Sequence, residues 1–168
     1  MKVLYVLRHA KSSWDDPGVA DHERPLAPRG KKAAERMAAY FRRHQIVPTL
    51  VLCSDARRAR QTLKPIEDFL AGKSDLRFEG DLYAATAEQL LGHLRSLEEV
   101  VPSVMLVGHN PGLQDLVLLL ARPGAKKQAA AGKFPTGALA RLELDPERWD
   151  QVGEDTGELT ELVLPRKL

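Results

Sequence analysis

The chain of 168 residues has a single cysteine, Cys53, so neither an intramolecular disulfide nor a cysteine-rich metal site is available to it. Long apolar runs are also missing, because the longest clean one, residues 116–121, is far too short to span a bilayer. The sequence passes from Met1 and Lys2 straight into a short apolar run instead of a signal peptide. We therefore expect a cytoplasmic protein without a membrane segment.

A strong excess of charge of one sign is lacking as well. The formal net charge of +2 is too small to imply by itself a nucleic acid or another polyanion as partner. The apolar share of 43% and the charged share of 29% are ordinary for a globular protein. No internal repeat, low-complexity tract or linker divides the sequence. Its length suits one domain, which we expect to cover residues 1–168.

What the sequence does contain is three short apolar runs, each followed directly by polar residues. Residues 3–7 precede Arg8 and His9, residues 50–52 precede the segment 54–62, and residues 104–107 precede Gly-His-Asn-Pro-Gly at 108–112. Such runs are typical of parallel strands buried on both faces, and ligands bind beyond the carboxyl ends of these strands. The pattern therefore predicts two histidines and several arginines at one edge of a sheet, a set suited to bind a phosphoryl group.

The wider pattern alternates strands and helices. We expect strands at residues 2–7, 50–53, 76–79, 104–107, 138–144 and 159–164, and helices at residues 30–44, 56–70, 86–97 and 112–120. Ser54 is expected to cap the second helix, Pro65 to kink it or end it early, and residues 122–133 to form a loop or frayed turn. Repeated strand–helix units predict an α/β fold, a three-layer α/β/α sandwich whose central sheet is mostly parallel and has helices on both faces.

Arg57, Arg58 and Arg60 fall in the first turns of the second helix. The helix dipole disfavours cations there by roughly 0.3–1 kcal/mol each. Departures from local preference are expected at functional sites, and an arginine here can contact the anion that a helix N-terminus attracts. The alternative is a solvated basic helix face. Spacing alone does not separate Arg57 from Arg58.

His109 is held between a glycine and Asn-Pro-Gly, a sequence that predicts a tight turn from a strand into a helix. Such a turn leaves the imidazole and backbone N–H groups at the edge of the sheet. His22, His44 and His93 lack this setting. No histidines have His-x-x-x-His or His-Glu-x-x-His spacing, so we predict no metal and no other cofactor.

These blocks carry a family resemblance. The runs Arg8-His9-Ala10-Lys11-Ser12, Ser54…Arg58-Ala59-x-Gln61-Thr62 and Gly108-His109-Asn110-Pro111-Gly112 resemble the histidine phosphatase (phosphoglycerate mutase-like) superfamily. The short length, the segment 21–30 and the segment 134–138 resemble its small SixA-type phosphohistidine phosphatase branch. The resemblance thus extends over nearly the whole chain.

The resemblance implies that His9 is the nucleophile and that Arg8, Arg58 and His109 form the phosphate pocket. Ser12 and Asn110 are further candidates for contacting substrate.

Two departures from the family pattern stand out. Ala10 replaces the glycine that usually follows Arg-His. The carboxylate that larger relatives use as general acid has no clear match here. Asp81 is the nearest candidate, although a loop carboxylate of this kind is more often a turn or cap residue.

The resemblance implies a metal-independent phosphatase with a phosphohistidine intermediate, acting on phosphohistidine of a protein partner. The alternative within the class is a phosphatase or mutase of a small phosphorylated metabolite, although mutases usually carry insertions that this chain lacks. A phosphoprotein-binding module is opposed by the intact His9. Binding of nucleic acid through residues 57–60 and 126–127 is opposed by the near-neutral net charge.

Overall fold

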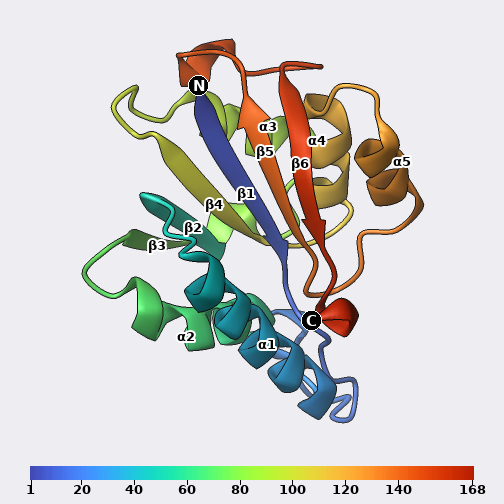
Figure 1. Ribbon diagram of the computed structural model, residues 1–168. Helices are drawn as coiled ribbons and strands as arrows, with labels where there is room; N and C mark the ends of the chain where they lie inside the picture. Colours follow the sequence, from blue (N-terminus) through green and yellow to red (C-terminus); the bar gives the residue numbers. More distant parts are fainter.

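The computed structural model describes residues 1–168, and a six-stranded sheet forms its centre (Figure 1). The strands are β1 (Lys2–Arg8), β2 (Leu50–Ser54), β3 (Asp75–Glu79), β4 (Ser103–Gly108), β5 (Leu139–Leu144) and β6 (Gly157–Val163). Their order in the sheet is β3-β2-β4-β1-β5-β6. The neighbours β3 and β2, β2 and β4, and β4 and β1 pair in parallel. Strand β5 pairs antiparallel with β1, and β6 pairs antiparallel with β5. The predicted mostly parallel sheet is confirmed.

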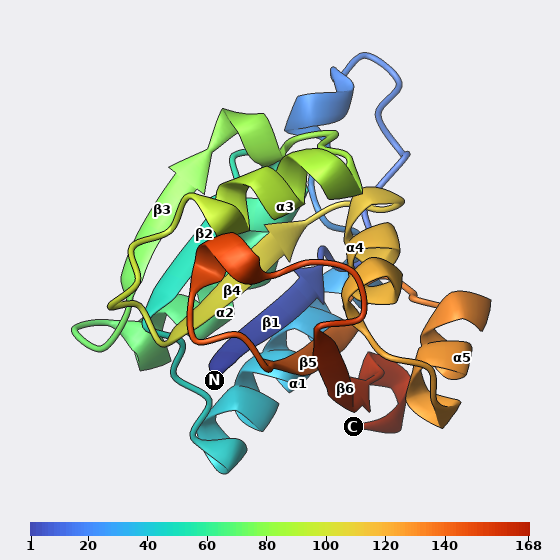
Figure 2. The ribbon, with the colours of Figure 1, turned by 90° about the horizontal axis from the view of Figure 1, so that it is seen from above.

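Helices cover both faces of this sheet. They are α1 (Pro28–His44), α2 (Arg57–Leu70), α3 (Ala87–Arg95), α4 (Gly112–Leu120) and α5 (Ala125–Gly132). Helices α1 and α2 lie on one face, whereas α3, α4 and α5 lie on the other (Figures 1 and 2). The predicted three-layer α/β/α arrangement is therefore confirmed. Each of the helices is too short or too polar to span a bilayer.

Strand β2 shows why the sheet has two separate cores. All five of its residues are buried, and successive side chains of a strand point to opposite faces. Leu50 and Leu52 join the apolar cluster that contains the buried residues of α3 and α4. Val51 and Cys53 join the cluster beneath α1 and α2. An unbroken apolar run is thus what a strand between two helical layers requires.

The strand register brings three chain segments to one edge of the sheet. Arg8 of β1 pairs with Gly108 of β4, and Cys53 of β2 pairs with Val107 of β4. Because these three strands are parallel and end at the same level, the residues that follow them meet at their carboxyl ends. The polar blocks found in the sequence are therefore neighbours in space.

The prediction of a loop or frayed turn over residues 122–133 was wrong, because Ala125–Gly132 forms helix α5. Three consecutive alanines lie in this helix, and alanine has the best intrinsic helix propensity. One of them, Ala130, is buried in the core, and the helix contacts α4 and β6. Tertiary packing and local propensity thus act together in a segment whose composition suggested a loop.

The expectations for the second helix need two corrections. Pro65 does not end α2 early, since the helix continues to Leu70. Leu63, Ile66 and Leu70 are completely buried, and this packing compensates for the backbone hydrogen bond that a proline cannot donate. Ser54 does not cap the helix, which starts after Ala56 without a side-chain cap.

Candidate active site

The predicted pocket residues meet at the carboxyl edge of the sheet. His9 follows β1, His109 follows β4, and Arg58 lies in the first turn of α2. The two imidazole rings lie 5.2 Å apart between centroids and are tilted by 53°. His9, Arg58 and His109 are each less than a tenth exposed, whereas Arg8 is partly buried.

The backbone around His9 is fixed on two sides. Its N–H donates to the carbonyl of Gly108 (2.9 Å), and the N–H of Gly137 donates to the carbonyls of Arg8 (3.1 Å) and His9 (3.0 Å). Gly137 adopts φ +79°, a left-handed conformation that favours glycine at this position. The nucleophile candidate is therefore attached to both β4 and the segment before β5.

The ring of His9 has a defined tautomer. Nδ1 lies 2.7 Å from the carbonyl oxygen of Ala10, and because a carbonyl only accepts, Nδ1 carries the proton. Nε2 is then left with its lone pair. Burial lowers the pKa of His9 to about 3, so the imidazole is neutral near pH 7. A neutral ring with a free lone pair is the form that attacks phosphorus.

The ring of His109 makes its hydrogen bond through the other nitrogen, Nε2. Its Nε2 lies 2.8 Å from Ser54 Oγ, and that oxygen already accepts the N–H of Ala56 (3.2 Å). Because Nε2 is the one acceptor within hydrogen-bond distance of the Ser54 hydroxyl, the hydroxyl donates its proton there, which leaves the ring proton on Nδ1. Burial and nearby Arg58 lower the pKa of His109 to about 4. His109 is thus a neutral hydrogen-bond donor.

Three buried side-chain nitrogens in the protein have no hydrogen-bond partner, and all three belong to the predicted pocket. They are Nε of Arg8, Nε of Arg58 and Nδ1 of His109. Leaving a buried donor unpaired costs about 1–3 kcal/mol, so such atoms are rare and call for an explanation. Each of the three carries a proton, so each is a hydrogen-bond donor without an acceptor inside the protein.

Arg58 also makes contacts that sequence reasoning missed. One terminal nitrogen donates to the carbonyl of Asp21 (2.7 Å) and the other to its Oδ2 (3.1 Å). Tyr83 donates its hydroxyl to the same carboxylate, and Arg24 Nε donates to Oδ1 (3.0 Å). The Tyr83 hydrogen bond, with help from the two arginines, holds the pKa of Asp21 well below its usual range. Asp21 is thus an ionised acceptor that fixes the end of Arg58.

A signal for Asp21 was present in the sequence, because it opens the segment 21–30 that carries part of the family resemblance. Its spacing from Arg58 gave no indication of contact. Tyr83 had no comparable signal. Asp21 opens a single 3-10 turn, Asp21–Glu23, and Tyr83 directly follows another, Gly80–Leu82. Both turns lie in loops whose paths depend on tertiary packing.

The Arg-Ala-x-Gln-Thr spacing that starts at Arg58 has a structural reason in this chain. Thr62 Oγ1 accepts the backbone N–H of Ala10 (2.9 Å), and Gln61 Oε1 accepts the backbone N–H of Leu26 (2.7 Å). Helix α2 thus supplies Arg58 to the pocket and also fixes two parts of the loop that follows His9. Arg57 and Arg60 are exposed, and Arg60 Nε donates to the carbonyl of Asp55 (2.9 Å).

The two weaker candidates are engaged within the protein. Ser12 Oγ accepts a hydrogen bond from Arg24 (2.8 Å). Asn110 Nδ2 donates to the carbonyl of Phe134 (3.0 Å), which also accepts from Arg8 (3.1 Å). Asn110 therefore acts on Arg8 through a shared acceptor. Direct contact of Ser12 or Asn110 with substrate stays a prediction.

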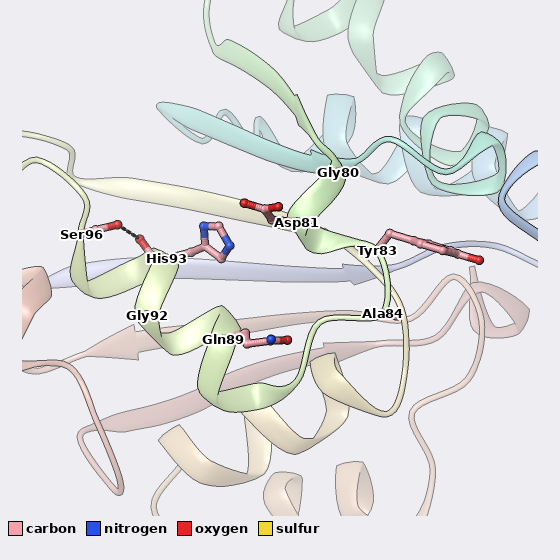
Figure 3. Close-up of a pocket in the computed structure, with 8 residues that line it drawn as sticks. All are labelled: Gly80, Asp81, Tyr83, Ala84, Gln89, Gly92, His93 and Ser96. Atoms are coloured by element: carbon pink, nitrogen blue, oxygen red, sulfur yellow. Dashed lines mark hydrogen bonds between the residues drawn. The ribbon is translucent and has the colours of Figure 1, made fainter.

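Asp81 lies in a different environment from the pocket residues. It is exposed in the turn Gly80–Leu82 and lines a hollow that includes Gln89 and His93. In Figure 3 the side chains of Asp81 and Tyr83 leave this turn in opposite directions, and Asp81 lies on the side of His93. Tyr83 lines the same hollow and also stacks edge-on against His109, with ring centroids 5.4 Å apart. No group of three or more His, Cys, Asp and Glu side chains has a metal-binding arrangement.

Comparison with known proteins agrees with this architecture. The family model described as histidine phosphatase superfamily (branch 1) matches residues 4–83. An uncharacterised protein from Mycobacterium tuberculosis is 34% identical over 164 residues, which cover 95% of this chain and 100% of that protein. The chain therefore belongs to the histidine phosphatase superfamily.

Two further relatives define the branch. The phosphohistidine phosphatase SixA of Escherichia coli is 29% identical over 144 residues, covering 84% of this chain and 85% of the relative. A solved SixA-type structure from Agrobacterium tumefaciens has a TM-score of 0.81 and 30% identity, covering 98% of each chain. Within the superfamily the chain is of the SixA type.

Proposed function

We propose that this protein is a metal-independent phosphatase that uses His9 as nucleophile and acts on phosphohistidine of a protein partner. The observation that carries the proposal is the set of three unpaired buried N–H donors on Arg8, Arg58 and His109 beside a neutral His9. Membership of the histidine phosphatase superfamily supports the phosphatase activity.

The reaction has two displacement steps. In the first, the Nε2 lone pair of His9 forms a bond to phosphorus while the bond to the leaving group breaks and its electron pair departs with that group. In the second, water attacks phosphorus, the N–P bond breaks, and its electron pair returns to Nε2. The water loses a proton and inorganic phosphate is released. His9 ends in the neutral form in which it started.

The three donors offset the charge on the phosphoryl oxygens. Arg8 and Arg58 supply two positive charges and directional N–H groups, which suit phosphate oxygens. His109 adds a neutral donor at Nδ1 through the tautomer that Ser54 selects. Donors arranged in advance stabilise the transition state because they need no reorganisation during the reaction. In this proposal the guanidiniums provide the positive charge that Mg²⁺ supplies to kinases.

The carboxylates near the pocket favour one class of leaving group. Asp21 is ionised by its partners, and the side chain of Asp81 leaves its turn away from Tyr83, on the side of His93, so our proposal assigns neither as a proton donor. An alkoxide leaving group needs such a donor, which typically contributes about 10²–10⁴-fold to the rate. Imidazole and phenolate leave more easily. The site therefore suits phosphohistidine and aryl phosphates better than phosphoserine or sugar phosphates.

The test compares kcat/KM for a phosphohistidine peptide with that for a phosphoserine peptide of the same sequence, both after prolonged EDTA treatment. We expect a preference of about 10²–10⁴-fold for phosphohistidine, since only the alkyl ester needs a general acid. Equal rates would overturn the substrate assignment. Loss of activity in EDTA that Mg²⁺ or Zn²⁺ restores would overturn the mechanism.

Asp21→Asn and Asp81→Asn serve as paired variants in this assay. If neither residue donates a proton, neither change should affect the phosphoserine peptide more than the phosphohistidine peptide. A selective loss on the phosphoserine peptide would identify that carboxylate as a general acid.

A further inference from the structure

A second feature of the molecule is a basic groove of about 630 Å³ at the same edge of the sheet. Its walls come from the loop after β1, from α1, from the segment before β5 and from the C-terminal turn Pro165–Lys167. Six cationic side chains line it: Lys11, Arg29, Lys32, Arg36, Lys133 and Arg166. We refer to this feature as the basic groove.

The charge of the basic groove is not balanced within the protein. No carboxylate lines it, all six cations are exposed, and none of them forms an ion pair. Arg29 and Lys32 lie in the first turns of α1, where the helix dipole disfavours cations and where no acidic residue compensates. Since the whole chain has a net charge of only +2, the remainder of the surface is net negative. Positive charge is therefore concentrated here.

The groove and the candidate active site share their supporting segments. Lys11 lies two residues after His9. Lys133 immediately precedes Phe134, whose carbonyl accepts from Arg8. Gly30 of α1 lies directly on the backbone of Lys11, because a Cβ at Gly30 would be 2.0 Å from the Lys11 oxygen.

The C-terminal turn completes the groove from the other side. Helix α1 contacts this turn, and the ring of Pro165 lies against Gly137. Figure 1 shows the C-terminus near the point where β1 ends and the loop toward α1 begins. A chain that places a phosphorylated side chain at His9 would therefore have its neighbouring residues close to the basic groove.

We propose that the basic groove binds an acidic segment of the phosphoprotein substrate, next to the phosphorylated residue. The proposal rests on the proposed function and adds a specificity determinant to it. Exposed ion pairs contribute little individually, so useful affinity requires an extended partner that contacts several cations at once. A polypeptide with several Asp or Glu residues meets this requirement.

The lining of the groove favours a polypeptide over a nucleic acid. No aromatic side chain lines it, whereas proteins that bind single strands stack bases on aromatic rings. The net negative remainder of the surface would repel a long polyanion that extends beyond the groove. A short acidic segment avoids this repulsion because its charge ends where the groove ends.

The experiment uses the full chain with two double variants of equal charge change. Lys32→Glu with Arg36→Glu reverses two cations of the groove. Lys31→Glu with Arg43→Glu is the matched control, because both residues are exposed on α1 and neither lines the groove. Circular dichroism and thermal unfolding establish that both variants fold.

Each protein is assayed on three substrates: a phosphohistidine peptide flanked by Glu and Asp, the same peptide with Gln and Asn in their place, and p-nitrophenyl phosphate. The measured quantity is the ratio of kcat/KM for the acidic peptide to that for the amide peptide. We expect the groove variant to lower this ratio about tenfold or more, since several surface charges act together. The control variant should change it by less than about twofold.

The outcomes separate the two proposals. If the unaltered protein hydrolyses neither p-nitrophenyl phosphate nor the peptides, the proposed function is wrong and this inference falls with it. If it hydrolyses them but the ratio is the same in all three proteins, only the inference is overturned. A single-stranded oligonucleotide that inhibits the unaltered protein but not the groove variant, without a change in the peptide ratio, would assign the groove to nucleic acid instead.

Discussion

The molecule carries positive charge in two neighbouring places, and they differ in burial. Arg58 is 6% exposed in the pocket, and its terminal nitrogens are fixed by Asp21. The cations of the basic groove are all exposed and unpaired. Water weakens each exposed interaction to at most about 1 kcal/mol, whereas loss of a buried charged partner costs about 3–5 kcal/mol. Burial thus suits the pocket cations to chemistry on a single phosphoryl group. Exposure suits the cations of the basic groove to recognition of an extended partner.

The largest effect expected in this comparison comes from the nucleophile. His9→Ala should lower kcat on every substrate by about 10⁶-fold, regardless of the charges that flank the phosphorylated residue, because it removes the group that bonds to phosphorus. Quenched reactions of the parent should contain acid-labile, base-stable phosphate on the protein, and the variant should contain none. His44→Ala, which changes an exposed histidine, is the control. Near-normal turnover by His9→Ala would refute the assignment.

The next effect separates buried from exposed arginines on the same helix. Arg58→Ala should cost about 3–4 kcal/mol of transition-state stabilisation, by analogy with the loss of one oxyanion donor. Arg57→Ala and Arg60→Ala remove exposed side chains and should each cost under about 1 kcal/mol. The measurement is kcat/KM on an aryl phosphate. The reverse order would mean that Arg58 does not contact the phosphoryl group.

The strands were predicted well from the sequence, because the apolar pattern that indicates each strand lies within one short segment of the chain. The strands ending at Arg8, Ser54 and Gly108 were predicted nearly to the residue, because apolar runs buried on both faces are readable from sequence. Each of these strands ends one residue later than predicted. Parallel topology then predicted that the blocks after these strands would meet.

Other features depend on contacts between distant segments and were not predictable. Ser54 looked like a helix cap, yet its hydroxyl pairs with His109, which is 55 residues away. The basic groove draws its cations from four separate parts of the chain, so no local run of charge predicts it. Asp21 was visible as part of a motif, but its contact with Arg58 depends on the path of the long connection between β1 and α1.

The buried histidines should also make stability depend on pH. An unfolded histidine titrates near pH 6.5, whereas in the folded state the pKa of His9 is about 3 and that of His109 about 4. Between these values the unfolded state binds more protons, so the free energy of unfolding falls as the pH falls below 6.5. The loss should be about 2 kcal/mol for each histidine between pH 7 and pH 5.

Urea unfolding at pH 7, 6 and 5 measures this loss. His9→Gln should reduce it by about 2 kcal/mol, because the variant no longer has that group to protonate on unfolding. His44→Gln is the matched control, because it removes an exposed imidazole outside the pocket. A pH dependence that is identical in the parent and in His9→Gln would contradict a buried neutral His9.

The smallest effect tests how the pocket controls a single proton. Ser54 is completely buried, and its hydroxyl fixes the ring proton of His109 on Nδ1, one of the three unpaired donors. In Ser54→Ala both tautomers become accessible, and the form with its proton on Nε2 offers no donor at Nδ1. We expect kcat/KM on an aryl phosphate to fall about tenfold, which corresponds to about 1–1.5 kcal/mol for one hydrogen bond.

A purely structural role of Ser54 would lower stability without moving this proton, so the deciding readout is the ¹⁵N chemical shifts of the His109 ring. They should report Nδ1–H in the parent and a mixture of tautomers in Ser54→Ala. Ser96→Ala removes an exposed hydroxyl and should match the parent in both measurements. If Ser54→Ala keeps the Nδ1–H tautomer, then another group fixes the ring proton of His109. The pocket would then differ from the basic groove in burial alone, and not also in having a donor whose direction is fixed before substrate binds.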